Sequence, residues 1–307
     1  MTIPTRDDVR AAAQRIAPHV RVTPCLSLKE GEHSLTMKLE YMQASGSFKA
    51  RGAFNRLLSG SVPPAGVVAA SGGNHGVAVA HAARALGLRA SIFVPASAPA
   101  AKRARIASLG ADVRLVGDSY AQALAAAEQF ARDSGALASH AYDHFDTICG
   151  QATVAMEWQA QCPGLDTVLV AVGGGGLIAG MAAWYRGSTK IVAVESEGCP
   201  TLHRAMQAGR IVDVEVGGLA ADALGARRVG EIVFPIARRW VAQSVLVDDD
   251  SIRSAQRWLW AEARVAAEPA GAAAMAAVLS GRYRPAPGER VGILVCGANF
   301  DPASLSQ

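Results

Sequence analysis

Residues 66–94, with the sequence GVVAASGGNHGVAVAHAARALGLRASIFV, decide the fold. The apolar run 66–70 predicts a strand, the Ala-rich segment 74–86 predicts a helix that ends at Gly87, and residues 90–94 predict a second strand. A strand, a helix and a strand in this order form a βαβ unit, in which the two strands lie parallel in one sheet.

The same alternation continues outward along the chain. Helices are expected at 102–109 and 119–133 with a strand between them at 112–116, and a second series has strands at 167–172, 190–195 and 291–295 and a helix that follows the glycines 173–176 and ends at Tyr185. Two such blocks predict an α/β fold with two mostly parallel, helix-covered open sheets. Ligands are expected at the carboxyl ends of the strands, in the cleft where the blocks meet.

Composition excludes several classes of protein. Half of the 307 residues are apolar and 18% are charged, so the chain can bury a large core and is not disordered. The net charge of +4 is spread without basic blocks, which argues against nucleic-acid binding. Five widely spaced cysteines with no C-x-x-C pair fit neither a disulfide framework nor a cysteine zinc site.

Targeting signals are also missing from the sequence. The N-terminal residues lack the basic and apolar halves of a signal peptide, and glycines divide the uncharged run 167–185, which fits a strand, loop and helix better than a membrane span. We therefore expect a soluble, cytoplasmic protein that binds no membrane.

A lysine follows a Gly/Ser turn at the start of a predicted helix in SGSFKARGA, residues 45–53. The pKa of a lysine amine falls near a helix N-terminus in apolar surroundings, and the neutral amine can attack a carbonyl carbon to form a Schiff base. Lys49 is therefore the candidate nucleophile. A lysine considered alone is most simply an exposed helix residue.

Two glycine-rich loops connect a predicted strand to a predicted helix. In SGGNHG, residues 71–76, backbone N–H groups would bind an anion such as a carboxylate, and Asn74 adds an amide. An ordinary tight turn with a capping residue is the simpler explanation of this loop. In GGGGL, residues 173–177, the backbone can close tightly around a phosphate.

The second loop also fits a dinucleotide-binding fingerprint. Gly174, Gly176 and Ala179 match G-x-G-x-x-A, and Glu195 follows about 20 residues later at the end of a strand. A nicotinamide-dependent oxidoreductase is therefore the main alternative, and an amino-acid-binding module without catalysis is another. The oxidoreductase leaves the motifs at 45–53 and 71–76 unexplained. A further motif, CGAN at 296–299, lies at the carboxyl end of a predicted buried strand.

The order of SGSFKARGA, SGGNHG, GGGGL, the segment AADA at 220–223 and CGAN resembles that of the fold-type II pyridoxal-phosphate enzymes. The similarity is to the serine/threonine dehydratase branch, which also holds serine racemase, and it covers nearly the whole chain. It implies a large cofactor-binding domain of residues 1–45 and 146–307, a small α/β domain of residues 46–145, and a homodimer.

The resemblance also implies which residues hold pyridoxal phosphate: Phe48, Lys49, Asn74, Gly173, Gly174, Gly175, Gly176, Leu177, Ala223 and Cys296. Lys49 would bind the cofactor aldehyde and later remove the α-proton of the substrate. Cys296 would lie opposite the ring nitrogen, where a thiol, unlike a carboxylate, does not keep the ring protonated, so prompt loss of a β-leaving group is favoured. The substrate would bind at Ser71, Gly72, Gly73, Asn74 and His75.

The implied reaction is dehydration and deamination of a small β-hydroxy amino acid, L-threonine or L-serine, to a 2-oxo acid and ammonia. Elimination or β-replacement on a bulkier 3-hydroxy amino acid is the alternative within the family. Gly72 stands where the racemases have a serine, so efficient racemisation is not expected. Thr201 replaces the Asp that accompanies Glu195 and Cys199 in cation-binding members, so no metal is expected.

Other polar residues have simpler explanations. Ser119 approximates a nucleophile elbow, but with Gln122 it forms a helix capping box. The segment 140–146 fits a polar loop better than a metal site, and its candidate ligands are His140, Asp143, His144 and Asp146. Glu268 is expected as a first-turn helix acid or, by the resemblance, as a site residue, and Arg51 is expected to be structural.

Overall fold

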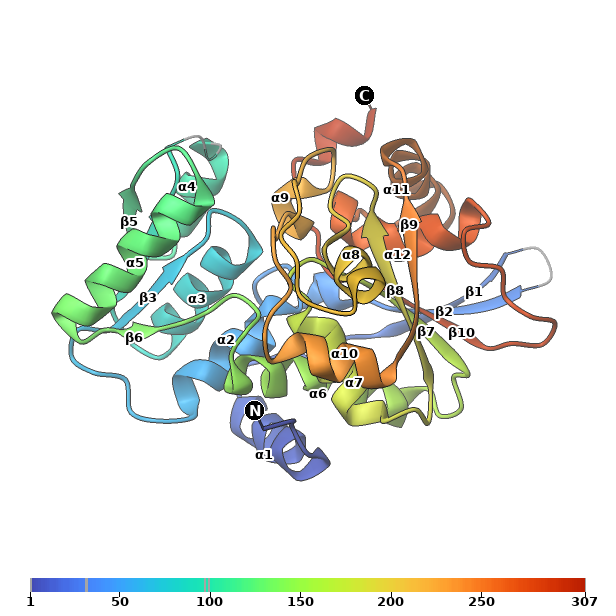
Figure 1. The fold of residues 1–307 in the computed structure, drawn as a ribbon, viewed down its shortest axis with the longest axis horizontal. Coiled ribbons are helices and arrows are strands. Elements are labelled where there is room, and N and C mark those ends of the chain that lie inside the picture. Colours follow the sequence, from blue (N-terminus) through green and yellow to red (C-terminus); the bar gives the residue numbers. More distant parts are fainter. Residues whose placement is uncertain (1, 31–32, 97, 99, 307) are drawn as a thin grey trace.

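A computed structural model describes residues 2–30, 33–96, 98 and 100–306, which form two sheets in two lobes (Figure 1). The larger sheet has six strands, in the spatial order β1 (Cys25–Glu30), β2 (His33–Lys38), β10 (Val291–Leu294), β7 (Thr167–Ala171), β8 (Lys190–Ser196) and β9 (Val241–Val247). The smaller sheet has four strands, in the order β5 (Asp112–Leu115), β4 (Ala90–Val94), β3 (Val67–Ala70) and β6 (Leu137–Ala138).

Helices pack against both sheets. The helices of the smaller lobe are α3 (Asn74–Ala85), α4 (Ala100–Ser108) and α5 (Tyr120–Ser134). The remaining helices are α1 (Arg6–Ile16), η1 (Glu40–Met42), α2 (Lys49–Leu58), α6 (Phe145–Gln161), α7 (Gly176–Tyr185), α8 (Thr201–Ala208), α9 (Ala221–Leu224), α10 (Val233–Trp240), α11 (Asp249–Ala263), α12 (Pro269–Leu279) and η2 (Pro302–Ser306).

The strand pairing confirms the predicted fold class. Every strand pair is parallel except β1 with β2, which form an antiparallel hairpin at the edge of the larger sheet. The elements predicted from residues 66–94 are β3, α3 and β4, with ends within one residue of the prediction. The hairpin and β9 were not expected from the sequence.

The smaller sheet is covered on both faces, as the alternation of strand side chains requires. Val67 and Ala69 of β3 pack in a cluster with α2, α3 and α4, whereas Val68 and Ala70 pack in a second cluster with α5. The Ser119 side chain caps α5 by accepting a hydrogen bond from the backbone N–H of Gln122, and the Gln122 side chain accepts from the Ser119 backbone. These two bonds confirm the predicted capping box.

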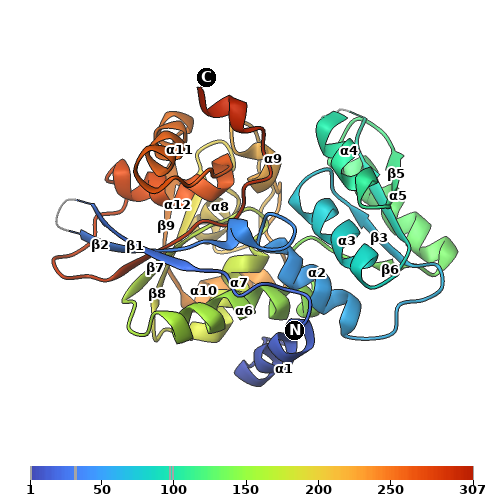
Figure 2. The same ribbon diagram turned by 180° about the vertical axis from the view of Figure 1, so that it is seen from behind.

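The larger sheet forms the main core. Every residue of β7 is buried, as expected for a central parallel strand that is covered on both faces. Helix α12 packs against β7, β8, β9 and β10. Helix α7 packs against β7 and β8 and also contacts α6 and α10 (Figure 2). Among the described residues, no helix combines the length and apolar character needed to cross a membrane.

Helices α2 and α6 approach each other closely at two glycines. A Cβ atom on Gly150 of α6 would lie 2.5 Å from the carbonyl oxygen of Arg51 and 2.7 Å from the Cα atom of Gly52. Because both neighbours are backbone atoms, they cannot rotate away, so the contact requires glycine at position 150.

We expect Gly150→Ala to lower the stability of the protein. Alanine gains about 1 kcal/mol of helix propensity over glycine, but overpacking against backbone costs about 1–3 kcal/mol and separates α2 from α6. The measurement is the urea midpoint followed by circular dichroism. Gly60→Ala is the matched control, because no atom lies within 4 Å of a Cβ at Gly60. A midpoint for Gly150→Ala at or above that of the control would contradict the close approach.

Candidate active site

A cavity of about 360 Å³ lies between the two lobes, at the carboxyl ends of β3, β7 and β10. It is lined by all of the residues that the sequence nominates for the cofactor and the substrate: Phe48, Lys49, Ser71, Gly72, Gly73, Asn74, His75, Gly173, Gly174, Gly175, Gly176, Leu177, Ala223 and Cys296. The fold therefore brings these segments together, while the role of each residue stays a prediction.

Lys49 is the first residue of α2 and extends into the cavity. Its Nζ donates a hydrogen bond of 2.6 Å to the carbonyl oxygen of Ala141 and lies 5.2 Å from the centre of the Phe48 ring. Burial lowers the pKa of the Lys49 amine to about 8, partly offset by the nearby Cys296 thiol. An appreciable fraction of the amine is therefore neutral near physiological pH, which is the nucleophilic form.

Cys296 follows β10 and is joined to the start of α2 through the backbone. The Phe48 amide donates to the Cys296 carbonyl oxygen at 3.0 Å, and Ser47 forms an antiparallel bridge with Gly297. Burial, reinforced by Glu268, raises the pKa of the Cys296 thiol. The thiol is therefore neutral at physiological pH.

The four-glycine loop connects β7 to α7 and leaves no room for side chains. A Cβ on Gly174 would overlap the ring of Tyr142, and one on Gly176 would lie 2.6 Å from the Tyr142 carbonyl oxygen. Gly175 has a φ angle of +91°, which other residues rarely adopt. The loop thus presents bare backbone to the cavity at the N-terminus of α7, an arrangement that attracts anions.

Asn74 belongs to a hydrogen-bonded triad that the sequence did not reveal. Its Nδ2 donates to Glu268 Oε1 at 2.6 Å, and its Oδ1 accepts from Asn299 Nδ2 at 2.6 Å. The backbone N–H of Asn299 donates to Glu268 Oε2 at 3.0 Å. These contacts orient the Asn74 side chain, which still has a second amide proton to donate.

Glu268 precedes α12, but its carboxylate makes no capping bond to that helix and lines the cavity instead. Burial raises the pKa of Glu268 to about 7, against the hydrogen bonds from Asn74 and Asn299 that favour the charged form. Of the two expectations for Glu268, the structure thus favours a position in the site.

His75 lies in the wall of the cavity and is neutral. Its Nε2 is 2.9 Å from the carbonyl oxygen of Ser139, and burial together with the nearby Lys49 lowers the pKa of His75 to about 3. The neutral ring therefore carries its proton on Nε2, where it donates to this carbonyl. Nearby, the Ser71 hydroxyl accepts from the Gly73 amide at 3.2 Å, which occupies one of the loop amides expected to bind an anion.

Glu195 does not line the cavity and has a structural role at the start of α8. Its carboxylate accepts hydrogen bonds of 2.7 Å from the Leu202 and His203 amides at the start of α8. Burial raises its pKa to about 7, against these bonds. The dinucleotide alternative required this carboxylate beside the glycine loop, so that alternative is not supported.

Residues 140–144 form a loop, as predicted for most of the segment 140–146, but Asp146 lies in the first turn of α6. His140 Nδ1 accepts from the Asp143 amide at 2.9 Å, and His144 caps α6. Within the described part of the chain, no group of three or more His, Cys, Asp or Glu side chains is arranged to hold a metal ion.

The sequence is similar to those of proteins from one enzyme family. A family model described as pyridoxal-phosphate dependent enzyme matches residues 16–297. A phenylserine dehydratase of Ralstonia pickettii is 35% identical over 315 residues, which cover 100% of this chain and 96% of that protein. An L-threonine ammonia-lyase of Thermotoga maritima is 36% identical over 270 residues, which cover 86% of this chain and 67% of that protein.

Comparison with solved structures points to the same family. The structure of maize serine racemase matches with a TM-score of 0.93 and 33% identity, covering 100% of this chain and 97% of that one. These findings confirm the resemblance inferred from the five motifs, and they exclude the nicotinamide alternative.

The titration of Lys49 tests the geometry of the site directly. We expect the amine in the cofactor-free chain to react with acetic anhydride at a rate that rises tenfold per pH unit up to about pH 8 and then levels, because only the neutral amine reacts. Peptide mass spectrometry measures the rate, with the exposed Lys29 as internal reference. A Lys49 rate that still rises well above pH 9 would show that the amine is not desolvated.

Proposed function

Since the chain belongs to the family of pyridoxal-phosphate-dependent enzymes, we propose that it is a dehydratase that converts a small β-hydroxy amino acid, L-threonine or L-serine, to a 2-oxo acid and ammonia. The observation that carries the proposal is that the partly neutral amine of Lys49 and the bare loop of Gly173 to Gly176 line the same cavity.

The residues of the cavity fit pyridoxal phosphate. The backbone of Gly173 to Gly176 would hold its phosphate, because these glycines line the cavity without side chains at the positive end of α7. Lys49 would bind its aldehyde, and the oriented amide of Asn74 would donate to its 3-hydroxyl. Phe48 and Ala223 would cover the ring, and Cys296 would face its nitrogen.

The bound cofactor supplies an electron-withdrawing ring that weakens the Cα–H bond of an attached amino acid. The chain supplies the groups that use this effect. The neutral amine of Lys49 accepts the α-proton at Nζ, and the loop from Ser71 to His75 binds the substrate carboxylate through backbone N–H groups. The neutral His75 holds this loop against Ser139 and adds no charge that would compete with the substrate.

Cys296 favours elimination over reactions that need a long-lived carbanion. Burial raises the pKa of its thiol, so Cys296 would present a neutral group to the ring nitrogen of a bound cofactor and would not stabilise a proton there. A less electron-poor ring suits a substrate that expels a hydroxyl group from its β-carbon promptly.

A bulkier substrate, 3-phenylserine, is the second candidate. The phenylserine dehydratase of R. pickettii aligns with the whole chain. The cavity wall also includes Pro95, Ala98, Tyr120 and Tyr142, which offer an apolar and aromatic surface to a large β-substituent. The homodimer and the cytoplasmic location inferred above stay predictions.

Lys49→Ala is expected to abolish both the yellow colour of the bound cofactor and the release of ammonia, with turnover reduced by about 10³-fold or more. Colour is read by absorbance, and ammonia and 2-oxo acid are assayed with L-threonine, L-serine and L-3-phenylserine. The control is Lys29→Ala, which removes an exposed lysine and should change neither. A coloured and active Lys49→Ala, or a wild type inactive on all three substrates, would refute the proposal, and the highest kcat/KM for phenylserine would favour the second candidate.

Racemisation is expected to be negligible. A racemase needs a second acid/base group on the ring face opposite Lys49, and Gly72 has no side chain to provide one. Chiral chromatography of a reaction with L-serine should therefore show 2-oxo acid and ammonia without accumulation of D-serine. D-serine that formed as fast as ammonia would show that another residue provides the proton.

A further inference from the structure

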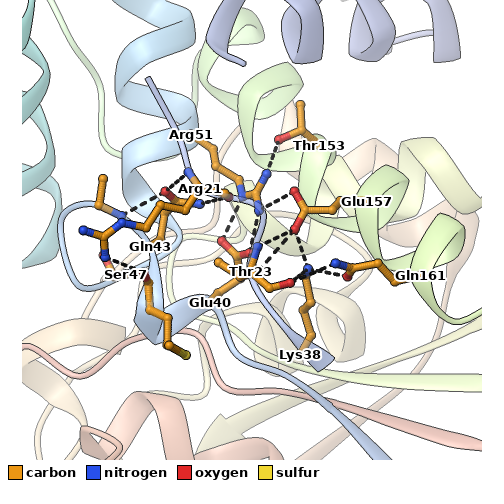
Figure 3. Close-up of polar contacts among 12 residues, drawn as sticks. Arg21, Thr23, Lys38, Glu40, Gln43, Ser47, Arg51, Thr153, Glu157 and Gln161 are labelled. Atoms are coloured by element: carbon orange, nitrogen blue, oxygen red, sulfur yellow. Dashed lines mark hydrogen bonds and ion pairs between the residues drawn. The ribbon is translucent and has the colours of Figure 1, made fainter. Parts of the chain in front are cut away.

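Arg51 lies two residues after Lys49 and is the centre of a buried charge network (Figure 3). Its Nε and Nη2 donate to the two carboxylate oxygens of Glu40 at 2.8 and 2.7 Å, and Nη2 also donates to Glu157 Oε2 at 2.9 Å. Nη1 donates to Thr153 Oγ1 at 3.3 Å. The planar guanidinium is therefore held by four contacts from η1 and α6.

Lys38 completes the network on the far side of Glu157. Its Nζ donates to Glu157 Oε1 at 2.5 Å and to the Thr23 carbonyl oxygen at 2.7 Å. The side chains of Lys38 and Glu40 are fully buried, and those of Arg51 and Glu157 are 2% and 15% exposed. Two cations face two anions, so the network is neutral as a whole.

Stability alone does not explain four buried charges at this place. Removing charges from water is expensive, and well-packed apolar residues often serve as well or better. Burial alone would lower the pKa of Arg51, but Glu40 and Glu157 raise it, so the guanidinium stays charged. A bidentate guanidinium–carboxylate pair differs from an apolar contact in one respect, because it fixes orientation as well as distance.

The contacts of Arg51 fix the orientation of the first turn of α2. Residues two apart on a helix point about 200° apart, so Arg51 faces α6 while Lys49 faces the cavity. Phe48, at the N-cap of α2, makes no side-chain capping bond, so the helix start lacks its usual anchor. The backbone bond from Phe48 to Cys296 holds one side of this turn, and the Arg51 network holds the other.

We propose that Arg51 is a positioning residue for Lys49: the paired carboxylates of Glu40 and Glu157 hold Arg51, and thereby hold the Lys49 amine at its place in the cavity. The inference rests on the proposed role of Lys49 as the reacting amine. It assigns Arg51 no contact with substrate or cofactor.

The test compares Arg51→Lys with Arg56→Lys in the full cofactor-free chain. Both variants keep the charge of α2 and lose the guanidinium fork, and Arg56 also pairs with α6, through Asp146 at 3.5 Å. A single ammonium cannot satisfy both carboxylates in the geometry of Arg51, so the first turn should loosen and admit water to Lys49. The measurements are the acetic anhydride titration of Lys49, the rate of recovery of colour on adding pyridoxal phosphate, and the melting temperature.

In Arg51→Lys, the pKa of Lys49 should rise by about one unit, a tenfold fall in the neutral fraction at a fixed lower pH, and recovery of colour should slow. In Arg56→Lys, the pKa of Lys49 and the rate of colour recovery should stay as in the wild type. If Arg51→Lys melts at a lower temperature but keeps the wild-type titration of Lys49, Arg51 is only structural and the proposal is wrong.

A milder variant covers the case in which Arg51→Lys does not fold. Glu157→Gln leaves Arg51 paired with Glu40 alone, and the Phe48 and Arg51 amides should then exchange hydrogen faster than in Arg56→Lys. Unchanged exchange would overturn the proposal. These measurements need no substrate, so they are independent of the reaction catalysed. Failure of the proposed function would appear instead as a wild type inactive on all three substrates, or as colour and activity retained by Lys49→Ala.

Discussion

A lysine amine is a nucleophile only when it is neutral, and in water it stays protonated to well above physiological pH. The site depends on relieving this constraint at Lys49, where burial lowers the pKa to about 8. Desolvation by the cavity wall achieves this, while the Ala141 carbonyl still accepts a hydrogen bond from Nζ. An amine fully exposed to water would stay charged, however well the surrounding residues were placed.

The parallel architecture explains why the other groups meet at the same cavity. In parallel sheets, the strands end and the following helices begin at one edge, so α3 and α7 both begin beside the cavity, preceded by glycine loops. The positive ends of these helices favour a phosphate and a carboxylate and disfavour a protonated lysine. Glu268, buried between Asn74 and Asn299, adds a titratable group to this edge.

The start of α2 is held by contacts of two different kinds. Backbone bonding to the end of β10 ties Phe48 to Cys296, and buried ion pairs tie Arg51 to η1 and α6. Close packing at Gly52 and Gly150 brings α2 and α6 near enough for those ion pairs to form. Directional contacts of this type place a reacting atom more narrowly than apolar packing can, which is the requirement of a site that must align an amine with a bound carbonyl.

The sequence by itself determined the βαβ elements, the capping of α5 by Ser119 and the loops that line the cavity, because hydrophobic periodicity, glycines and caps act over a few residues. Only the tertiary structure decided that Glu268 bonds Asn74, that Asn299 completes the triad, and that Arg51 pairs with Glu40 and Glu157. It also decided the β1–β2 hairpin and the edge strand β9. These contacts join residues that are distant in the chain, and they depend on strand order and register, which no local pattern of residues specifies.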